Sequence, residues 1–204
     1  QVKEPGWVTP FTFLDHFINE ELLLTRDAEK NLHCLSNVCT HRGNLVAEVP
    51  CKVRDLRCKY HGRRFGLNGK FLSMPEFKEV KNFPAETDNL ASLPLFKWGK
   101  WLFASLGNNL PAEDFFGDMI RRVGWIPVDQ FVHRPDLSKE YIVNAHWALY
   151  CENYLEGFHI PFVHAGLNSV IDYSNYAVEL FRYSSLQLGI GREGELAFDL
   201  PKSS

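Results

Sequence analysis

Short apolar stretches bounded by turn residues dominate the first hundred residues of the chain. Within them, apolar and polar side chains alternate or form brief apolar runs, as is typical of strands that bury one face. Asn68-Gly69 lies inside one stretch, and we expect a type I′ hairpin turn there because both residues tolerate a positive φ. Many short strands without a long helix predict a small antiparallel sandwich. The predicted strands span residues 7–14, 21–26, 32–38, 53–58, 65–72 and 98–106.

The pattern changes after residues 107–111, whose glycine, asparagines and proline indicate a domain boundary. Apolar residues recur every three or four positions between 147 and 159, which predicts an amphipathic helix. Strand-like stretches return at residues 186–190 and 195–198. The sequence therefore predicts an α+β fold, with an all-β domain over residues 1–107 and an α+β domain with an antiparallel sheet over residues 108–204.

Cysteine and histidine occur together in two short segments separated by 16 residues, Cys39-Thr40-His41 and Cys58-Lys59-Tyr60-His61. Each segment offers one thiolate and one imidazole. This set suits a two-iron cluster in which one iron takes both sulfurs and the other iron takes both nitrogens. Gly43 and Gly62 follow the two pairs, and glycine lets a loop backbone approach such a cluster closely. Zinc is the alternative, although zinc sites commonly pair Cys with Cys and His with His.

Composition limits the partners of the chain. It has 204 residues, 45% of them hydrophobic, so it can bury a core. The net charge of −3 argues against nucleic acid and anionic membranes as partners, and no apolar run is long enough to cross a bilayer. With two cysteines assigned to metal, Cys34, Cys51 and Cys151 are too few for a secreted disulfide framework. We therefore expect a cytoplasmic protein.

A second group of metal-binding residue types lies on the predicted helix and just after it. Glu156 and His159 are three residues apart, so on a helix they share one face. His164 is too far round an uninterrupted helix to bind the same ion, but Pro161 would end or kink that helix and bring it back. Two imidazoles and a carboxylate are the ligands of non-haem Fe(II) oxygenases. The alternative is a surface acid and two helix-end histidines without a metal.

Taken together, the two groups resemble the α subunit of the Rieske non-haem iron oxygenases, which include ring-hydroxylating dioxygenases, monooxygenases and demethylases. The resemblance spans essentially the whole chain. It implies that Cys39 and Cys58 hold one iron of a Rieske [2Fe-2S] cluster, while His41 and His61 hold the other. The residues that carry it are the two Cys and His segments and the run Asn153-Tyr154-Leu155-Glu156 with His159 and His164.

The resemblance also implies roles around a mononuclear Fe(II). His159 and His164 would bind this iron, and Asn153 would lie near it. Glu156 would bridge the two metal centres by contacting His159 on one side and the cluster ligand His61 of a neighbouring subunit on the other. Many relatives have Asp in place of this Glu.

Two positions indicate the branch of the family. Where the respiratory-complex branch has an additional pair of cysteines joined in a disulfide, this chain has Asn44 and Tyr60. The resemblance therefore points to the branch of ferredoxins and oxygenases. It implies O2 as co-substrate, a small organic substrate, and a homotrimer. Electrons would come from a reductase or ferredoxin, so NAD(P)H would act only indirectly.

The third iron ligand in this family is an Asp or Glu far downstream. Acidic residues occur between 172 and 199, but none stands in the matching context. The sequence after Gly107 is also short for the catalytic domain that the resemblance implies. We therefore expect a partial catalytic domain that belongs to a longer protein.

Three functions remain open from the sequence. The first is a terminal oxygenase component that hydroxylates or demethylates a small molecule. The second is a Rieske-type ferredoxin, which needs only residues 1–107 and leaves His159 and His164 unexplained. The third is a zinc-stabilised binding module without a redox role.

Overall fold

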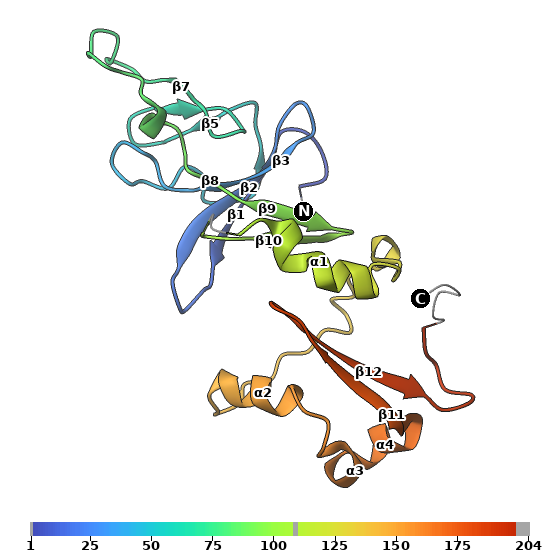
Figure 1. The fold of residues 1–204 in the computed structure, drawn as a ribbon. Helices are drawn as coiled ribbons and strands as arrows, with labels where there is room; N and C mark the ends of the chain where they lie inside the picture. The colour runs from blue at the N-terminus through green and yellow to red at the C-terminus, as the bar shows by residue number, and fades with distance from the viewer. Residues whose placement is uncertain (1, 108–109, 199–204) are drawn as a thin grey trace. The chain divides into compact units, whose positions relative to one another are not determined.

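The computed structural model describes residues 2–107 and 110–198. Asn108 and Asn109, in the predicted boundary, lie outside the described residues. The chain divides into two compact units, Gln1–Asn109 and Leu110–Ser204 (Figure 1). The first unit is built from antiparallel strands and the second from helices and a β-hairpin, so the predicted α+β fold class is confirmed. None of the helices in the described ranges is long and apolar enough to traverse a bilayer.

Three antiparallel sheets make up the first unit. The largest has the strand order β4-β1-β2-β3-β8, and its centre is the hairpin of β1 and β2, in which Val8 faces Thr25. Its strands are β1 (Trp7–Phe13), β2 (Glu20–Arg26), β3 (Leu32–Ser36), β4 (Cys51–Lys52) and β8 (Ser92–Leu93). The other two sheets are β5 (Leu56–Arg57), β6 (Arg64–Phe65) and β7 (Phe71–Ser73), and the hairpin of β9 (Leu95–Trp98) with β10 (Trp101–Ala104). A 3-10 turn, η1 (Glu86–Asp88), precedes β8.

The core of this unit lies between the five-stranded and three-stranded sheets. Leu23 of β2 pairs with Leu35 of β3, and both side chains are fully buried. Phe65 of β6 is equally buried in the same cluster of apolar residues. Cys39 and Cys58 belong to this cluster, so the core itself reaches the two loops that carry the Cys and His pairs.

Some predicted strands of this unit are wrong in their bounds. The stretch 53–58 is not one strand, because the chain turns at residues 54–55 between β4 and β5, which belong to different sheets. The stretch 98–106 contains β10, but Trp98 ends the preceding strand, and the chain reverses at Gly99, whose φ is +58°. Turn residues inside an apolar run were the missed signal.

The predicted type I′ turn at Asn68-Gly69 is also wrong. Only Gly69 has a positive φ, +81°, and its N–H donates to the carbonyl of Gly66 at 2.9 Å. The turn therefore spans residues 66–69, and its last residue, Gly69, is in the left-handed conformation, a common alternative for hairpins. Leu67 at its centre is buried, and its carbonyl accepts a hydrogen bond from the buried Thr25 hydroxyl at 2.5 Å. Burial of Leu67 explains why the turn forms here.

The second unit consists of helices followed by the long hairpin of β11 and β12. An ion pair joins its first helix to the hairpin, with Arg122 Nε donating to Glu179 Oε2 at 2.9 Å. His146 is exposed and caps the next helix by accepting a hydrogen bond from the Ala148 N–H. The elements are α1 (Ala112–Val123), η2 (Val128–Gln130), α2 (Trp147–Tyr154), α3 (Ile160–Val163), α4 (Ala165–Val170), β11 (Ile171–Leu180) and β12 (Ser185–Gly191).

The helix predicted over residues 147–159 is shorter than expected. Helix α2 ends at Tyr154, Leu155 is its C-cap, and α3 begins only at Ile160. Pro161 stands in the first turn of α3, where its fixed φ suits a helix start, so it does not end the helix. The chain instead breaks near the buried Gly157, where a Cβ would lie 2.4 Å from the Tyr176 ring. Residues 195–198, predicted as strand-like, form no strand.

Replacing Gly69 with Ala tests the packing beneath the turn at residues 66–69. An added Cβ would lie 2.9 Å from Leu35 Cδ2, and the positive φ adds backbone strain. We expect Gly69→Ala to lower the free energy of unfolding by about 2–4 kcal/mol in urea titrations. Gly43→Ala is the matched control, because Gly43 has φ +71° but open space around it. It should cost about 1 kcal/mol. Equal losses in the two variants would contradict the packing account.

Acid stability tests the turn that joins β2 to β3. Burial acts to raise the pKa of Asp27, but hydrogen bonds from His33 and from Asn31 outweigh it, so the pKa lies below its usual value. A lowered folded-state pKa stabilises the fold above the unfolded-state pKa of about 4, and this stabilisation disappears as the pH falls through the folded-state value. Urea midpoints should therefore favour wild type over Asp27→Asn at pH 7 and converge at an acid pH below the folded-state pKa of Asp27.

Glu29→Gln, a change of an exposed carboxylate in the same turn, is the control. It should leave the urea midpoint near wild type at both pH values. A wild-type advantage over Asp27→Asn that persists unchanged in acid would show that the charge of Asp27 is not the cause.

Candidate functional site

The two Cys and His loops are closed by the same pair of backbone hydrogen bonds. In each loop the cysteine N–H donates to the carbonyl five residues on, at 2.9 Å for Cys39 and 2.8 Å for Cys58. The glycine four residues after each cysteine donates back to the cysteine carbonyl at 3.0 Å. These glycines, Gly43 and Gly62, have φ of +71° and +70°. The loops are therefore near copies in their backbone, although His41 stands two residues after its cysteine and His61 stands three.

The loops place sulfur and nitrogen on different sides. Cys39 and Cys58 are only 3% and 2% exposed, at the edge of the core. His41 is half-buried and His61 is exposed, and their ring centroids lie 4.7 Å apart. A two-iron cluster with an inner thiolate-bound iron and an outer imidazole-bound iron needs this separation of sulfur from nitrogen.

Burial affects the protonation of one ligand in each class, the thiol of Cys39 and the imidazole of His41. Burial raises the pKa of the Cys39 thiol, and the neighbouring Cys58 adds to this increase against an opposing hydrogen bond from the His41 N–H. Burial and the positive charges around it lower the pKa of His41, which keeps the ring neutral at physiological pH. The buried Nδ1 of His41 has no hydrogen-bond partner, although a buried ring nitrogen rarely stays unpaired. A metal ion would accept this lone pair, so the residues fit a cluster.

The positions that replace the disulfide cysteines contact the ligands. The Asn44 side-chain amide lies 3.8 Å from Cys58 Sγ, a distance compatible with a weak N–H···S hydrogen bond. The exposed ring of Tyr60 packs on His61 with centroids 4.0 Å apart. All five cysteines are free thiols, in agreement with the absence of that disulfide.

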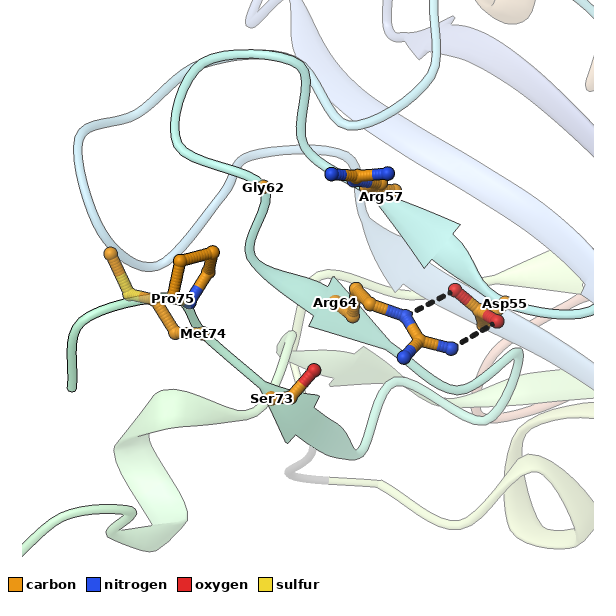
Figure 2. Close-up of a pocket in the computed structure, with 7 residues that line it drawn as sticks. All are labelled: Asp55, Arg57, Gly62, Arg64, Ser73, Met74 and Pro75. Atoms are coloured by element: carbon orange, nitrogen blue, oxygen red, sulfur yellow. Dashed lines mark hydrogen bonds and ion pairs between the residues drawn. The ribbon is translucent and has the colours of Figure 1, made fainter. Parts of the chain in front are cut away.

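Two open pockets adjoin the second loop. One, of about 460 Å³, is lined by residues 57–62 and Pro75. The other, of about 610 Å³, contains the ion pair of Arg64 with Asp55, with Nε and Oδ1 2.9 Å apart (Figure 2). Both pockets include Arg57 and Gly62, so a groove with a cationic wall lies beside the ligand His61. No sequence signal marks this groove, because its lining joins residues from three short strands.

The second candidate group gathers around the short helix α3. His159 precedes α3 and His164 follows it, and their ring centroids lie 4.9 Å apart. The predicted shared helix face for Glu156 and His159 is wrong, because α2 ends before Glu156. The two side chains nevertheless meet, with the Glu156 carboxylate against His159 Nδ1. The break between the helices brings them together.

The contact with Glu156 assigns a tautomer to His159. The hydrogen bond with His159 lowers the pKa of Glu156, so the carboxylate is ionised and the ring donates its Nδ1 proton. Nε2 of His159 then carries the free lone pair, as in histidines that bind metal and are held by a carboxylate. The same carboxylate accepts the N–H of Phe158, which fixes its position. His159 and His164 therefore fit as two ligands of one ion.

Neither the predicted residue Asn153 nor the nearby acidic residues that the structure describes complete this site. Asn153 is exposed in the last turn of α2. Asp172 accepts hydrogen bonds from Ser174, and Glu179 pairs with Arg122. Across residues 2–107 and 110–198, no three His, Cys, Asp or Glu side chains gather closely enough to hold one metal ion. Asp199 lies outside the described residues.

The chain is similar to known proteins over most of its length. A family model of the Rieske [2Fe-2S] domain matches residues 10–84. The chain is 29% identical over 196 residues to the chloroplastic choline monooxygenase of Beta vulgaris, covering 92% of this chain and 42% of that protein. It is 25% identical over 185 residues to the carnitine monooxygenase oxygenase subunit of Escherichia coli, covering 89% and 49%. The chain thus spans about half the length of these relatives.

The fold agrees with a solved structure as well. The crystal structure of the quaternary ammonium Rieske monooxygenase CntA, in complex with an inhibitor, superposes with a TM-score of 0.71 at 21% identity. The superposition covers 94% of this chain and 53% of that one. The likeness therefore extends through both compact units of the chain.

Replacement of one outer ligand tests the cluster assignment. We expect His61→Ala to abolish the visible absorption and the EPR signal of a reduced Rieske cluster, because one iron loses half of its protein ligands. His33→Ala is the control, since His33 lies in the same unit but is bound to Asp27. Persistence of the Rieske signals in His61→Ala would refute the ligand assignment.

Proposed function

Because the chain belongs to the family of Rieske non-haem iron oxygenase α subunits, we propose that it is the electron-accepting and oxygen-activating part of a terminal oxygenase. Residues 1–107 would form the Rieske domain, and residues 108–204 would form the N-terminal part of the catalytic domain. The observation that carries the proposal is that one chain holds both the paired Cys and His loops and the Glu156, His159 and His164 group.

In the first unit, Cys39, Cys58, His41 and His61 would hold the [2Fe-2S] cluster. The bound cluster would supply electrons one at a time. The apolar core keeps water from the two sulfurs, because Cys39 and Cys58 are almost fully buried. His61 is the exposed ligand, so it is the residue through which an electron can leave the unit.

In the second unit, His159 and His164 would hold a mononuclear Fe(II). The bound iron would supply the site at which O2 is reduced. Glu156 orients His159 by accepting its Nδ1 proton, which directs Nε2 towards a metal. In a homotrimer, the other side of the same carboxylate would contact His61 of the neighbouring subunit and so couple the two centres. Asn153, exposed at the end of α2, would lie near the iron.

We propose a small quaternary ammonium compound as the substrate, to be hydroxylated or demethylated. The support is that the relatives reported above are named for choline, carnitine and quaternary ammonium oxidation. Glu156, where many family members have Asp, is a further point of likeness to alkylammonium-oxidising relatives. A ferredoxin without its own oxygenase activity is less favoured, because the likeness to the monooxygenases continues far beyond residue 107.

The electron donor would be a reductase or ferredoxin that draws on NAD(P)H. The groove beside His61, with Arg57 in its wall, is a surface that such a donor could contact. A cytoplasmic location remains a prediction from cysteine usage, since the plant choline monooxygenases are named as chloroplastic proteins.

Removal of the bridging carboxylate tests the proposed coupling. In protein loaded with iron and sulfide and supplied with a reductase, Glu156→Ala should retain both metal centres. It should lose about 10- to 100-fold in the rate of choline- or carnitine-dependent O2 consumption, because His159 loses its orienting partner. Iron content and EPR of the same samples verify the metal centres.

Glu152→Ala is the matched control for this test, because Glu152 is an exposed carboxylate on α2. Its rate should stay near that of wild type. A near-normal rate in Glu156→Ala would contradict the proposed bridge.

A further inference from the structure

Arg63, directly after the second ligand loop, is a buried cation inside an aromatic cage. Its side chain is 2% exposed. The guanidinium carbon lies 5.8, 5.0 and 5.6 Å from the ring centroids of Phe65, Phe71 and Phe83. Rings at this distance attract a cation through their negative faces, and more strongly where water is excluded. Arg63 thus keeps its charge in the interior of the first unit.

Asp88, in the 3-10 turn η1, is the ionic partner of Arg63. Its carboxylate pairs with Nη2 of Arg63, and its other oxygen accepts the N–H of Ala85 at 2.7 Å. Burial acts to raise the pKa of Asp88, but these hydrogen bonds and the Arg63 charge outweigh it and hold the pKa below its usual value. The pair is therefore ionised at neutral pH.

The same residue also connects the two ligand loops. The main-chain carbonyl of Asp88 accepts the Thr40 hydroxyl at 2.8 Å, and Thr40 stands between the ligands Cys39 and His41. Nη2 of Arg63 lies 3.3 Å from this carbonyl. The Arg63 carbonyl in turn accepts the N–H of the ligand Cys58 at 2.8 Å. One short turn thus contacts the first loop through Thr40 and the second loop through Arg63.

Arg63 is close to the second ligand loop in both sequence and contact. It stands two residues after the ligand His61, and its carbonyl accepts the Cys58 N–H, whereas Asp88 reaches the first loop through its main-chain carbonyl. An apolar side chain would fill the aromatic cage without the desolvation that a buried cation suffers. Packing alone therefore does not explain an arginine at this position.

We propose that Arg63 and Asp88 form a positioning pair, in which Asp88 joins the two ligand loops and the buried Arg63 cation raises the reduction potential of the cluster between them. The inference rests on the proposed function, because it requires that the four ligands hold a [2Fe-2S] cluster. One-electron reduction adds negative charge to a cluster, and a fixed cation nearby favours the reduced state.

The test is a redox titration of the full chain with dithionite and mediators, followed by visible absorption and EPR. We expect Arg63→Met to shift the potential in the negative direction, because it removes the cation with little change in side-chain length. Asp88→Asn should shift it in the positive direction, because it removes the compensating anion. Arg63→Lys should stay closer to wild type than Arg63→Met. Opposite signs distinguish an electrostatic role from simple loosening of the site.

Neighbouring residues provide matched controls. Arg64→Met and Asp55→Asn remove an ion pair of the same type one residue away, but Arg64 is 45% exposed and screened by water. Their potentials should move much less than those of the buried pair. Thr40→Val removes only the hydroxyl that reaches Asp88, so it should speed loss of cluster iron to a chelator without shifting the potential.

The outcomes distinguish a failure of the proposed function from a failure of the inference alone. A wild-type chain that binds neither iron nor sulfide contradicts the proposed function. A wild-type cluster with unchanged potential in Arg63→Met, shifts of the same sign in Arg63→Met and Asp88→Asn, or an equal shift in Arg64→Met overturns the inference alone. If Arg63→Met fails to take up a cluster, Asp88→Asn decides: a positive shift supports the inference, and an unchanged or negative shift overturns it.

Discussion

The repeated closure of two short loops is the constraint on which the candidate cluster site depends. Each loop hides its cysteine N–H and carbonyl in backbone hydrogen bonds, and each needs a glycine at a positive φ to do so. Because the backbone N–H and carbonyl of each cysteine are paired within its loop, both sulfurs can enter the apolar core without leaving these backbone groups unpaired. The imidazoles lie nearer the surface, with His41 half-buried and His61 exposed, and the site acquires a buried half and a more exposed half.

This asymmetry connects the fold to the proposed function. The buried half joins the core between two antiparallel sheets, which gives the sulfurs a rigid and dry position. The exposed half ends in His61, beside a groove with Arg57 in its wall. A cluster held in this way is insulated on one side and open to another protein on the other. In the second unit, Glu156 prepares His159 for metal binding by accepting its Nδ1 proton.

Much of the fold and of the candidate site could be predicted from residue types and their spacing. The strands 7–14 and 21–26, and both Cys and His segments, could be predicted because alternating apolar positions and ligand pairs are local signals. The spacing of three residues correctly suggested that Glu156 and His159 lie together. The expected reason, a shared helix face, was wrong. A turn between α2 and α3 brings them together, and that turn is set by the close approach of Gly157 to Tyr176. Such a contact links distant parts of the chain and leaves no periodic signal.

The role of Arg63 and Asp88 was likewise out of reach from the sequence. A charged residue after the ligand glycine reads as a surface position, and the aromatic rings that bury it come from β6, β7 and the segment before η1. Only the three-dimensional arrangement shows that one turn touches both loops. The prediction of a type I′ turn at Asn68-Gly69 was wrong for a similar reason, because burial of Leu67 outweighed the local preference of the dipeptide.

The account's central claim is that one chain carries both a Rieske cluster and a mononuclear iron. The most direct measurement is the ratio of iron to acid-labile sulfide in the purified, reconstituted protein. The account predicts about three irons for every two sulfides, two in the cluster and one at His159 and His164. About two irons for every two sulfides would indicate an electron carrier without an oxygenase iron. Zinc in place of iron and sulfide would contradict the account altogether.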